Sequence, residues 1–281
     1  MAEAPRTDWA KRAPDPRLAA YVESYLGYSM KGFPPGLHRG LPGRNMTFIV
    51  SIGNPIDVVE QTDPAEAPGS YRCVVGGLQM RQATISHCGE QEGVAIELTP
   101  LGSRALLGAP AAALWNSSHE LGDVVGRGGD ELWERLQLAV SWDERLAACD
   151  TVLLGLLAEA QVAPELDHSW HRLVETGGSV GVAELAAEVG WTRQHLARRF
   201  GREFGLAPKS AGRVMRFERA RRMLQHSPSY VTLAQVAASC GYFDQSHFTH
   251  EFVEMAGCTP SQWLIDEVPS VQDRAGGEPS P

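Results

Sequence analysis

One pattern occurs twice in this chain, with about fifty residues between the two starts, and it constrains the fold more than any other feature. The first copy runs from Val182 to Pro208 and the second from Leu233 to Pro260. Each copy reads as a short helix that stops at a glycine, a tight turn, and a second helix whose apolar residues recur one turn apart. A glycine turn followed by a capped helix is the plan of a helix-turn-helix unit. The repeat therefore predicts two such units.

The ends of the predicted helices carry residues that helix termini favour. Thr192 and Asp244 stand where the second helices begin and can accept a hydrogen bond from the first turn. Gly205 and Gly257 stand where these helices end, each with a proline three residues later. We expect the first helices over residues 182–189 and 233–240, and a helix between the two copies over 209–225. That middle helix would be about 25 Å long, which suits two binding sites one DNA turn, about 34 Å, apart.

A helical solenoid is the structural alternative to a pair of DNA-binding units. Solenoids need about three or more copies stacked at a short period. This chain has two copies with a separate helix between them. The repeat therefore favours DNA binding over packing alone.

Positive charge is concentrated in one segment of an acidic chain. Between Arg193 and Arg222 there are ten Lys and Arg residues and two Glu residues, whereas the whole chain has a formal net charge of −9. A basic segment of this kind neutralises DNA phosphates and releases their counterions. A run of charge can also be a solvated face, and the helix over 209–225 could be that. Its coincidence with the helix-turn-helix pattern favours a DNA-binding strip.

Residues 167–266, about a third of the chain, resemble the DNA-binding domain of the AraC/XylS family of bacterial transcription regulators. The second copy carries the resemblance, with the run GYFDQSHF from Gly241 to Phe248 and then Phe252, Gly257, Thr259, Pro260 and Trp263 at fixed spacing. In that family, two helix-turn-helix units joined by one helix place their second helices in successive major-groove segments on one DNA face. The resemblance implies the same arrangement here.

The resemblance assigns DNA contacts to the second helix of the first unit. Gln194, Ala197 and Arg198 would face bases, while Arg193, Arg199 and Arg202 would contact phosphates. Arg suits the O6/N7 edge of guanine and Gln the N6/N7 edge of adenine, and Gln194 and Arg198 share a helix face because they are four residues apart. Ala197 replaces a longer polar residue and would at most contact a thymine methyl.

The second unit departs from the family pattern. Ser246 and His250 would face bases, with Gln245 at the DNA backbone and His247 beside them. Residues 231–263 contain no Lys or Arg but three acids, Asp244, Glu251 and Glu254. We expect the first unit and the middle helix to provide most of the affinity. The second unit is then a weak reader or a surface that touches RNA polymerase.

The first half of the chain has the pattern of a small antiparallel β domain. A short helix is expected over 18–25, strands over 46–52, 56–60, 71–75, 83–88 and 94–98, and then two amphipathic helices over 131–138 and 142–160. Ser141 and Glu144 form a capping box for the longer helix. The resemblance implies a cupin-like jelly roll that binds an effector. The two helices either pack on the β domain or form a dimer seam.

Histidines and cysteines give no sign of a metal or disulfide site. Cupin metal chemistry needs a close pair of histidines followed by a Glu, whereas His38, His87 and His119 stand alone in the sequence. The five cysteines are scattered without a CxxC pair, which fits a reducing cytoplasm and neither a metal site nor a disulfide framework. We expect no cofactor, no membrane span and no secretion signal.

These observations predict an α+β chain with two functional parts. Residues 1–14 are expected to be a flexible N-terminus, 15–163 a sensing and dimerising β domain with flanking helices, 167–266 the all-α double helix-turn-helix domain, and 267–281 a flexible tail. Residues 161–167 would form the linker.

The predicted function is a cytoplasmic, sequence-specific transcription regulator that is not an enzyme. Its expected partners are operator or promoter DNA, RNA polymerase for an activator, a small-molecule effector, and a second copy of the chain. One alternative is a DNA-repair or other enzyme fused to this type of DNA-binding domain, which would need an activated cysteine or a zinc cluster. The other is a ligand- or protein-binding module with degenerate DNA binding.

Overall fold

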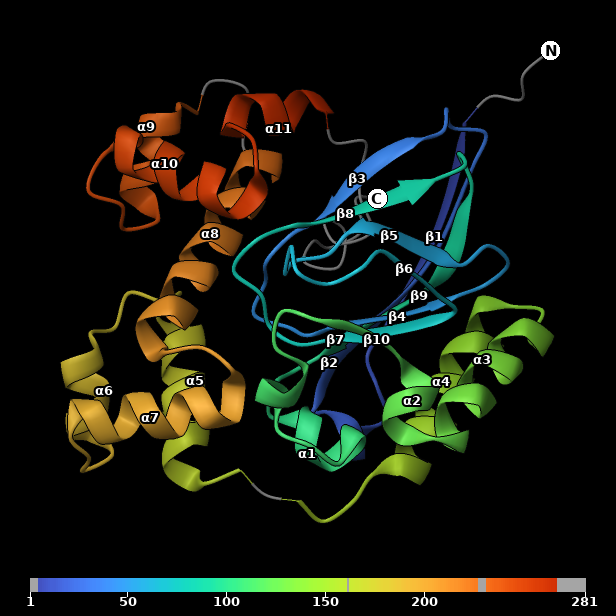
Figure 1. Cartoon of the computed structure of the whole chain (residues 1–281), viewed down its shortest axis with the longest axis horizontal. Helices are drawn as coiled ribbons and strands as arrows, with labels where there is room; N and C mark the ends of the chain where they lie inside the picture. The colour runs from blue at the N-terminus through green and yellow to red at the C-terminus, as the bar shows by residue number, and fades with distance from the viewer. Residues whose placement is uncertain (1–4, 161, 227–230, 267–281) are drawn as a thin grey trace.

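The structure, a computed structural model, describes residues 5–160, 162–226 and 231–266. Figure 1 shows a β-rich part with its own helices beside a helical part that contains both copies of the repeat. This mixed architecture confirms the predicted α+β class. The predicted flexible tail at 267–281 and the first four residues lie outside the described residues. None of the described helices is both long enough and apolar enough to cross a membrane.

The β domain consists of two antiparallel sheets that face each other. The order in the larger sheet is β1 (Arg6–Arg12), β2 (Val22–Lys31), β9 (Gln91–Leu98), β4 (Thr47–Ser51), β7 (Cys73–Gly76) and β10 (Ser118–Glu120). The order in the smaller sheet is β3 (Gly36–Gly40), β8 (Ala83–His87), β5 (Ile56–Glu60) and β6 (Gly69–Tyr71). Strands that are neighbours in space are often distant in sequence, as in a jelly roll. The predicted cupin-like architecture is confirmed.

The larger sheet is buried on both faces. One face packs on the smaller sheet through a small cluster that includes Val74, Ile56 and Ile85. The opposite face packs on helices through residues such as Phe48 and Leu153. These helices are α1 (Gly102–Leu107), α2 (Leu121–Val125), α3 (Arg127–Leu138) and α4 (Trp142–Leu156), with the 3₁₀ turns η1 (Pro16–Leu18) and η2 (Ala111–Leu114) beside them. The helix pair predicted over 131–160 therefore packs on the β domain.

Double burial explains one wrong prediction. The helix expected over 18–25 does not form, because residues 22–31 are the strand β2 between β1 and β9. A central strand that is buried on both faces loses the alternation of polar and apolar residues, so its periodicity does not distinguish it from a helix. The segment expected to be flexible also contains a strand, since Arg6–Arg12 pairs with β2 along its whole length.

The helical part has seven helices in its described residues, and the repeat forms as predicted. They are α5 (Pro164–Glu175), α6 (Val182–Glu188), α7 (Arg193–Phe204), α8 (Pro208–His226), α9 (Leu233–Ser239), α10 (Gln245–Ala256) and α11 (Pro260–Asp266). The first unit is α6–α7, the second is α9–α10, and α8 is the helix between them. α5 begins at Pro164, inside the predicted linker, because Leu166 and Trp170 are buried in the helical core.

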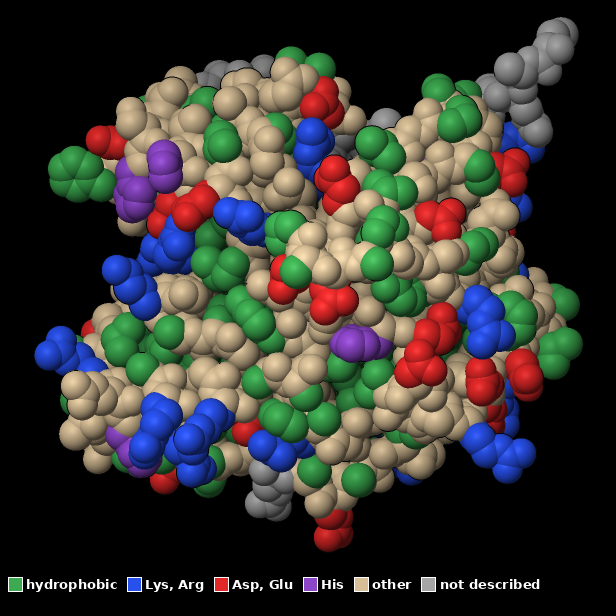
Figure 2. All heavy atoms as spheres, viewed as in Figure 1, with side chains coloured by type: hydrophobic (Ala, Val, Ile, Leu, Met, Phe, Trp, Pro, Cys, Tyr) green, Lys and Arg blue, Asp and Glu red, His purple; other side chains and the backbone are tan. Residues whose placement is uncertain are grey.

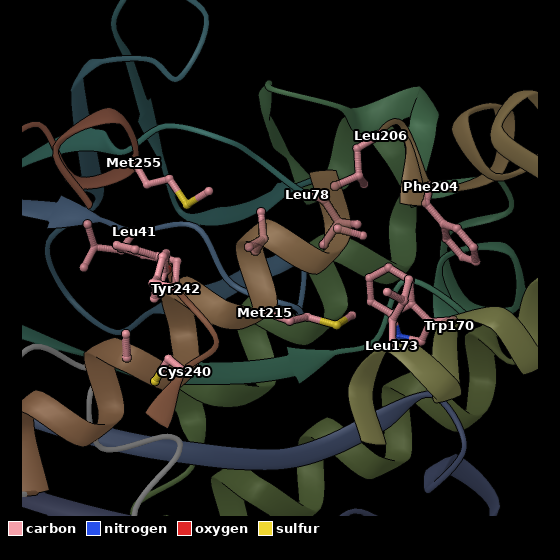
Figure 3. Close-up of a cluster of buried hydrophobic side chains, with 14 of the residues drawn as sticks. Leu41, Leu78, Trp170, Leu173, Phe204, Leu206, Met215, Cys240, Tyr242 and Met255 are labelled. Atoms are coloured by element: carbon pink, nitrogen blue, oxygen red, sulfur yellow. The ribbon is translucent and has the colours of Figure 1, made fainter. Parts of the chain in front are cut away.

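The helical core continues into the β domain. Leu41 and Leu78 from β-domain loops belong to the same buried cluster as Met215 of α8 and Phe204 of α7. Figure 3 shows Leu78 next to Leu206, with Phe204 toward one end of the cluster and Leu41 at the other end, beside Tyr242. One continuous apolar cluster therefore joins the two parts, and no local sequence pattern predicts this contact.

A close approach of two backbones fixes the first unit against α8. Gly178, in the loop between α5 and α6, has a φ of 77°, and a Cβ on it would lie 2.1 Å from the carbonyl oxygen of Gly212 in α8. Arg216 strengthens this contact, since its Nη1 donates to the carbonyl of Gly178 at 3.1 Å. The loop and α8 can therefore meet only where neither residue carries a side chain.

We expect Gly178→Ala to destabilise the protein more than Gly190→Ala. Gly190 has a φ of 70° but open space around it, so its substitution should cost only the strain of a left-handed alanine, about 1–2 kcal/mol. Gly178→Ala adds a clash with the α8 backbone. Urea unfolding of the two variants tests this, and equal losses would contradict the proposed close approach.

Candidate nucleic-acid interface

The two units share one register when their helices are aligned on their N-caps. The side chains of Thr192 and Asp244 accept hydrogen bonds from the third residue of α7 and of α10, as predicted. Four and eight residues after each cap stand buried side chains, Leu196 and Phe200 in α7 and Phe248 and Phe252 in α10. The same register pairs Gln194 with Ser246 and Arg198 with His250. The α10 positions are therefore the counterparts of those in α7.

The exposed face of α7 carries all of the residues predicted to contact DNA in the first unit. Arg193, Gln194, Arg198, Arg199 and Arg202 are exposed, and Ala197 is half-buried. Figure 2 shows Lys and Arg side chains gathered over α7 on one side of the molecule. Gln194, Arg198 and Arg202 lie one helical turn apart in a single row, since each follows the last by four residues.

Two contacts orient the arginines of α7. The guanidinium of Arg198 lies 3.4 Å from Nδ1 of His195, and that of Arg199 lies over the Trp191 ring at 6.0 Å from its centre. Both side chains stay exposed. They are thus free to meet an anionic or hydrogen-bonding surface.

The predicted residues of the second unit are also exposed. Gln245, Ser246, His247 and His250 lie on the exposed side of α10, where histidines gather in Figure 2. Nδ1 of His247 accepts a hydrogen bond from the backbone N–H of Phe243 at 3.3 Å, and its Nε2 lies 3.4 Å from a carboxylate oxygen of Glu251. These contacts fit a neutral imidazole with its proton on Nε2.

The prediction of an exposed basic strip along the middle helix is wrong for most of α8. Arg213 and Arg216 have side chains 23% and 20% exposed, and Arg221 is buried with 5% exposure. Arg222 pairs with Glu218 of the same helix. Arg219 is the exposed arginine of the described α8. The exposed positive charge of the predicted strip is therefore mostly that of α7.

The arginines of α8 instead hold the second unit in place. Arg213 donates from Nε to Glu251 at 2.8 Å and pairs through Nη2 with Glu254. Arg216 lies over the Tyr242 ring, 5.8 Å from its centre, and 3.9 Å from Glu251. The acids that make α10 look anionic in sequence are thus neutralised from α8. Sequence reasoning missed this because the partners are 38 and 41 residues apart.

The β domain touches both units through polar contacts as well. Arg104 of α1 forms a bidentate ion pair with Glu203 of α7, at 2.6 and 2.9 Å, and the hydrogen bond to Glu203 raises the pKa of Arg104. Trp115 packs on Gly205, the C-cap of α7. Gln82 lies against Gly257, the C-cap of α10. These contacts place the β domain at the C-terminal ends of α7 and α10. No sequence pattern predicts that these residues are neighbours.

Two histidines that stand alone in sequence are neighbours in the structure. The rings of His38 in β3 and His87 in β8 lie 5.9 Å apart, because these strands pair. Desolvation lowers the pKa of His87. Within the described residues, no group of three or more His, Cys, Asp or Glu is arranged to hold a metal ion.

We expect Arg104→Ala to loosen the β domain from α7. The change leaves the Glu203 carboxylate, which is 7% exposed, without its partner and should cost about 1–3 kcal/mol of the free energy of unfolding. Adding Glu203→Gln should recover part of this loss, because a buried amide is cheaper to desolvate than a carboxylate. Arg172→Ala is the matched control, since it breaks an Arg–Glu pair on the surface and should change little. Equal effects of Arg104→Ala and Arg172→Ala in urea unfolding would contradict this role.

Comparison with known proteins identifies the two parts separately. Residues 185–265 match a helix-turn-helix domain family, and residues 10–120 match a domain family of unknown function (DUF6597). The HTH-type regulator Rv1931c of Mycobacterium tuberculosis is 31% identical over 87 residues, 31% of this chain and 33% of that protein. The RhaR activator of Salmonella arizonae is 32% identical over 68 residues, 24% of this chain and 23% of that protein. The chain thus aligns with a third or less of these relatives' length.

Solved structures share the whole fold at low sequence identity. An apo variant of ToxT from Vibrio cholerae has a TM-score of 0.51 and 13% identity, covering 90% of this chain and 99% of that one. ToxT bound to a naphthalenyl-butenoic acid has a TM-score of 0.50 and 12% identity, covering 94% and 99%. These neighbours support the arrangement of a β domain followed by two helix-turn-helix units. The match over residues 185–265 and the HTH-type regulators among the relatives agree with the resemblance of this part of the chain to the AraC/XylS family of transcription regulators.

Proposed function

We propose that this protein is a sequence-specific transcription regulator that reads DNA with both helix-turn-helix units. The observation that carries the proposal is the shared N-cap register, which gives α7 and α10 matched exposed faces. A helix presented in this way fits the major groove, where its N-terminal residues reach base edges. In α7, Gln194, Ala197 and Arg198 face bases, and Arg193, Arg199 and Arg202 contact phosphates. In α10, the corresponding surface is Gln245, Ser246, His247 and His250.

The environments of the buried cysteines support regulation over catalysis. Burial raises the pKa of the Cys149 thiol to about 12 and also raises that of Cys73. A nucleophilic cysteine needs the opposite shift, toward the thiolate. The relatives named above are HTH-type transcriptional regulators, which agrees with a protein that acts by binding.

An effector acting through the β domain is the second part of the proposal. Two cavities of about 90 and 660 Å³ lie where the β domain meets α8, and both are lined by Arg44, Glu218 and Arg222. A molecule bound there would touch the β domain and the helix that carries both units. Because ToxT has been solved with an organic acid bound, a small organic molecule is the proposed class of effector.

We further propose that the protein acts as a homodimer and as an activator in the bacterial cytoplasm. Leu138 and Val140, at the turn between α3 and α4, are 81% and 87% exposed and offer an apolar surface to a second copy. An activator bound beside a promoter also contacts RNA polymerase. The name of the relative RhaR, an activator, supports that direction of control.

Selection of duplexes from a random library with the full chain tests the function. We expect a bipartite site with a footprint spanning two half-sites about one turn apart. On that site Arg198→Ala should cost about 1–3 kcal/mol of specific affinity, because a bidentate base contact is lost. Arg202→Ala should weaken selected and random duplexes equally. Failure to enrich any sequence would refute the function, and an equal loss on random DNA would refute the role of Arg198. Arg216 is no suitable control, because it holds the fold together.

We expect His250→Arg to tighten binding and to steepen its salt dependence. An arginine at position 250 is long enough to reach a base or a phosphate, so it would add up to one phosphate contact, a change of about −0.9 in the slope of log affinity against log salt. Titrations between low and moderate salt measure this slope. If the second unit lies off the DNA, the substitution will be silent and the footprint will cover a single half-site.

A further inference from the structure

Phe243 is the most exposed large apolar side chain in the described residues, at 91%. It lies in the turn of the second unit, between Gly241 and the N-cap Asp244. The first unit goes from Gly190 through a single residue, Trp191, to its N-cap Thr192. The second turn is therefore one residue longer, and the extra residue is a phenylalanine.

The turn does not need Phe243 for its packing. Tyr242 already fills the place that Trp191 fills in the first unit, since each ring lies edge-on to the histidine three residues after the N-cap, at 5.5 and 4.6 Å. Tyr242 is 5% exposed and packs on Phe248. Phe243 thus projects beyond a turn that is already complete. Single exposed apolar side chains are common on protein surfaces, so the position of Phe243, and not its exposure alone, indicates what it contacts.

Its neighbours belong to the face proposed to meet DNA. Gln245 and Ser246 follow it in the first turn of α10, and they are the counterparts of Arg193 and Gln194 in α7. The hydrogen bond from the Phe243 backbone N–H to Nδ1 of His247 ties the turn to α10. The turn that carries Phe243 is therefore attached directly to the first turn of α10, where the face proposed to read DNA begins.

The lack of basic residues in the second unit indicates which kind of contact it can make with DNA. Residues 231–266 contain no Lys or Arg, so α10 has no strong partner for phosphates. Glu251 and Glu254 are paired with Arg213, so they no longer present free negative charge to repel DNA. The start of α10 therefore presents the apolar ring of Phe243 beside the neutral polar side chains of Gln245 and Ser246. In the major groove, the apolar feature that such a ring can meet is the C5-methyl of thymine.

We propose that Phe243 is a specificity-determining residue that packs on thymine methyl groups in the half-site read by the second unit. This inference rests on the proposed function of DNA reading. The contact removes apolar surface from water, so it adds affinity that does not depend on salt. It makes the two units chemically different readers, with α7 acting through charge and hydrogen bonds and α10 through apolar contact.

The test uses the full chain and a duplex selected by the wild-type protein. Phe243→Ser should weaken binding about tenfold, the loss of one partly buried ring, with an unchanged log–log salt slope. Replacing the thymines of the second half-site by deoxyuridine removes only their methyl groups. It should weaken the wild type similarly and leave Phe243→Ser unaffected. Leu37→Ser, at a 66% exposed apolar residue of β3, is the matched control and should bind as the wild type does.

The outcomes separate this inference from the function on which it depends. Wild-type protein that selects no duplex would overturn the proposed function itself. If the wild type selects a duplex and Phe243→Ser binds it equally well, only this inference is overturned. The ring would then be assigned to contact with a protein partner. A wild type that is indifferent to deoxyuridine, or a Phe243→Ser loss that appears as a changed salt slope, would also overturn the methyl contact.

Discussion

Arg213 reaches from α8 to two carboxylates of α10, and one of them, Glu251, is only 6% exposed. A buried carboxylate without a cation is strongly unfavourable, so the ion pair with Arg213 stabilises the docking of α10 in this place. Arg216 adds a contact to Tyr242 and reaches back to Gly178 beside the first unit. The placement of both units on one rigid helix therefore depends on these arginines.

The same ion pairs give the exposed faces of the two units different charges. Arginines consumed inside the fold cannot neutralise DNA phosphates, so the exposed positive charge lies mostly on α7. The acids of α10 are neutralised at the same time, which leaves its exposed face with histidine, serine and an aromatic ring. Binding by the first unit should thus be sensitive to salt, whereas binding by the second should be governed by apolar and hydrogen-bonding contacts.

A continuous core connects the β domain to the helices that carry both helix-turn-helix units. Leu41 and Leu78 pack in the same cluster as Phe204 and Met215, and Arg104 pairs with Glu203 of α7. A ligand shifts a conformational equilibrium only as far as it contacts the two states differently. The cavities beside α8 lie at this junction, so an occupant would bear on the helix that carries both readers.

The sequence alone determined the local structure of the helical part. Glycine turns, the caps Thr192 and Asp244, and apolar residues one turn apart are signals that act within a few residues. The helices of the two copies and the helix between them formed within one or two residues of their predicted ends, whereas α5 and α11 were not predicted. The exposed face of α7 followed from the same periodicity. The strand β2 was missed, because burial on both faces removes the alternation that marks a strand.

Tertiary structure decided which charged side chains are exposed and which are paired inside the fold. Arg198 and Arg213 are indistinguishable by composition, yet one is exposed and the other is paired with Glu251, 38 residues away. The pairings Arg104–Glu203 and Gly178–Gly212 likewise join residues that no local pattern connects. Local propensity fixes where a helix begins and ends, but the partner of a charged side chain depends on which distant surfaces the packed core brings together.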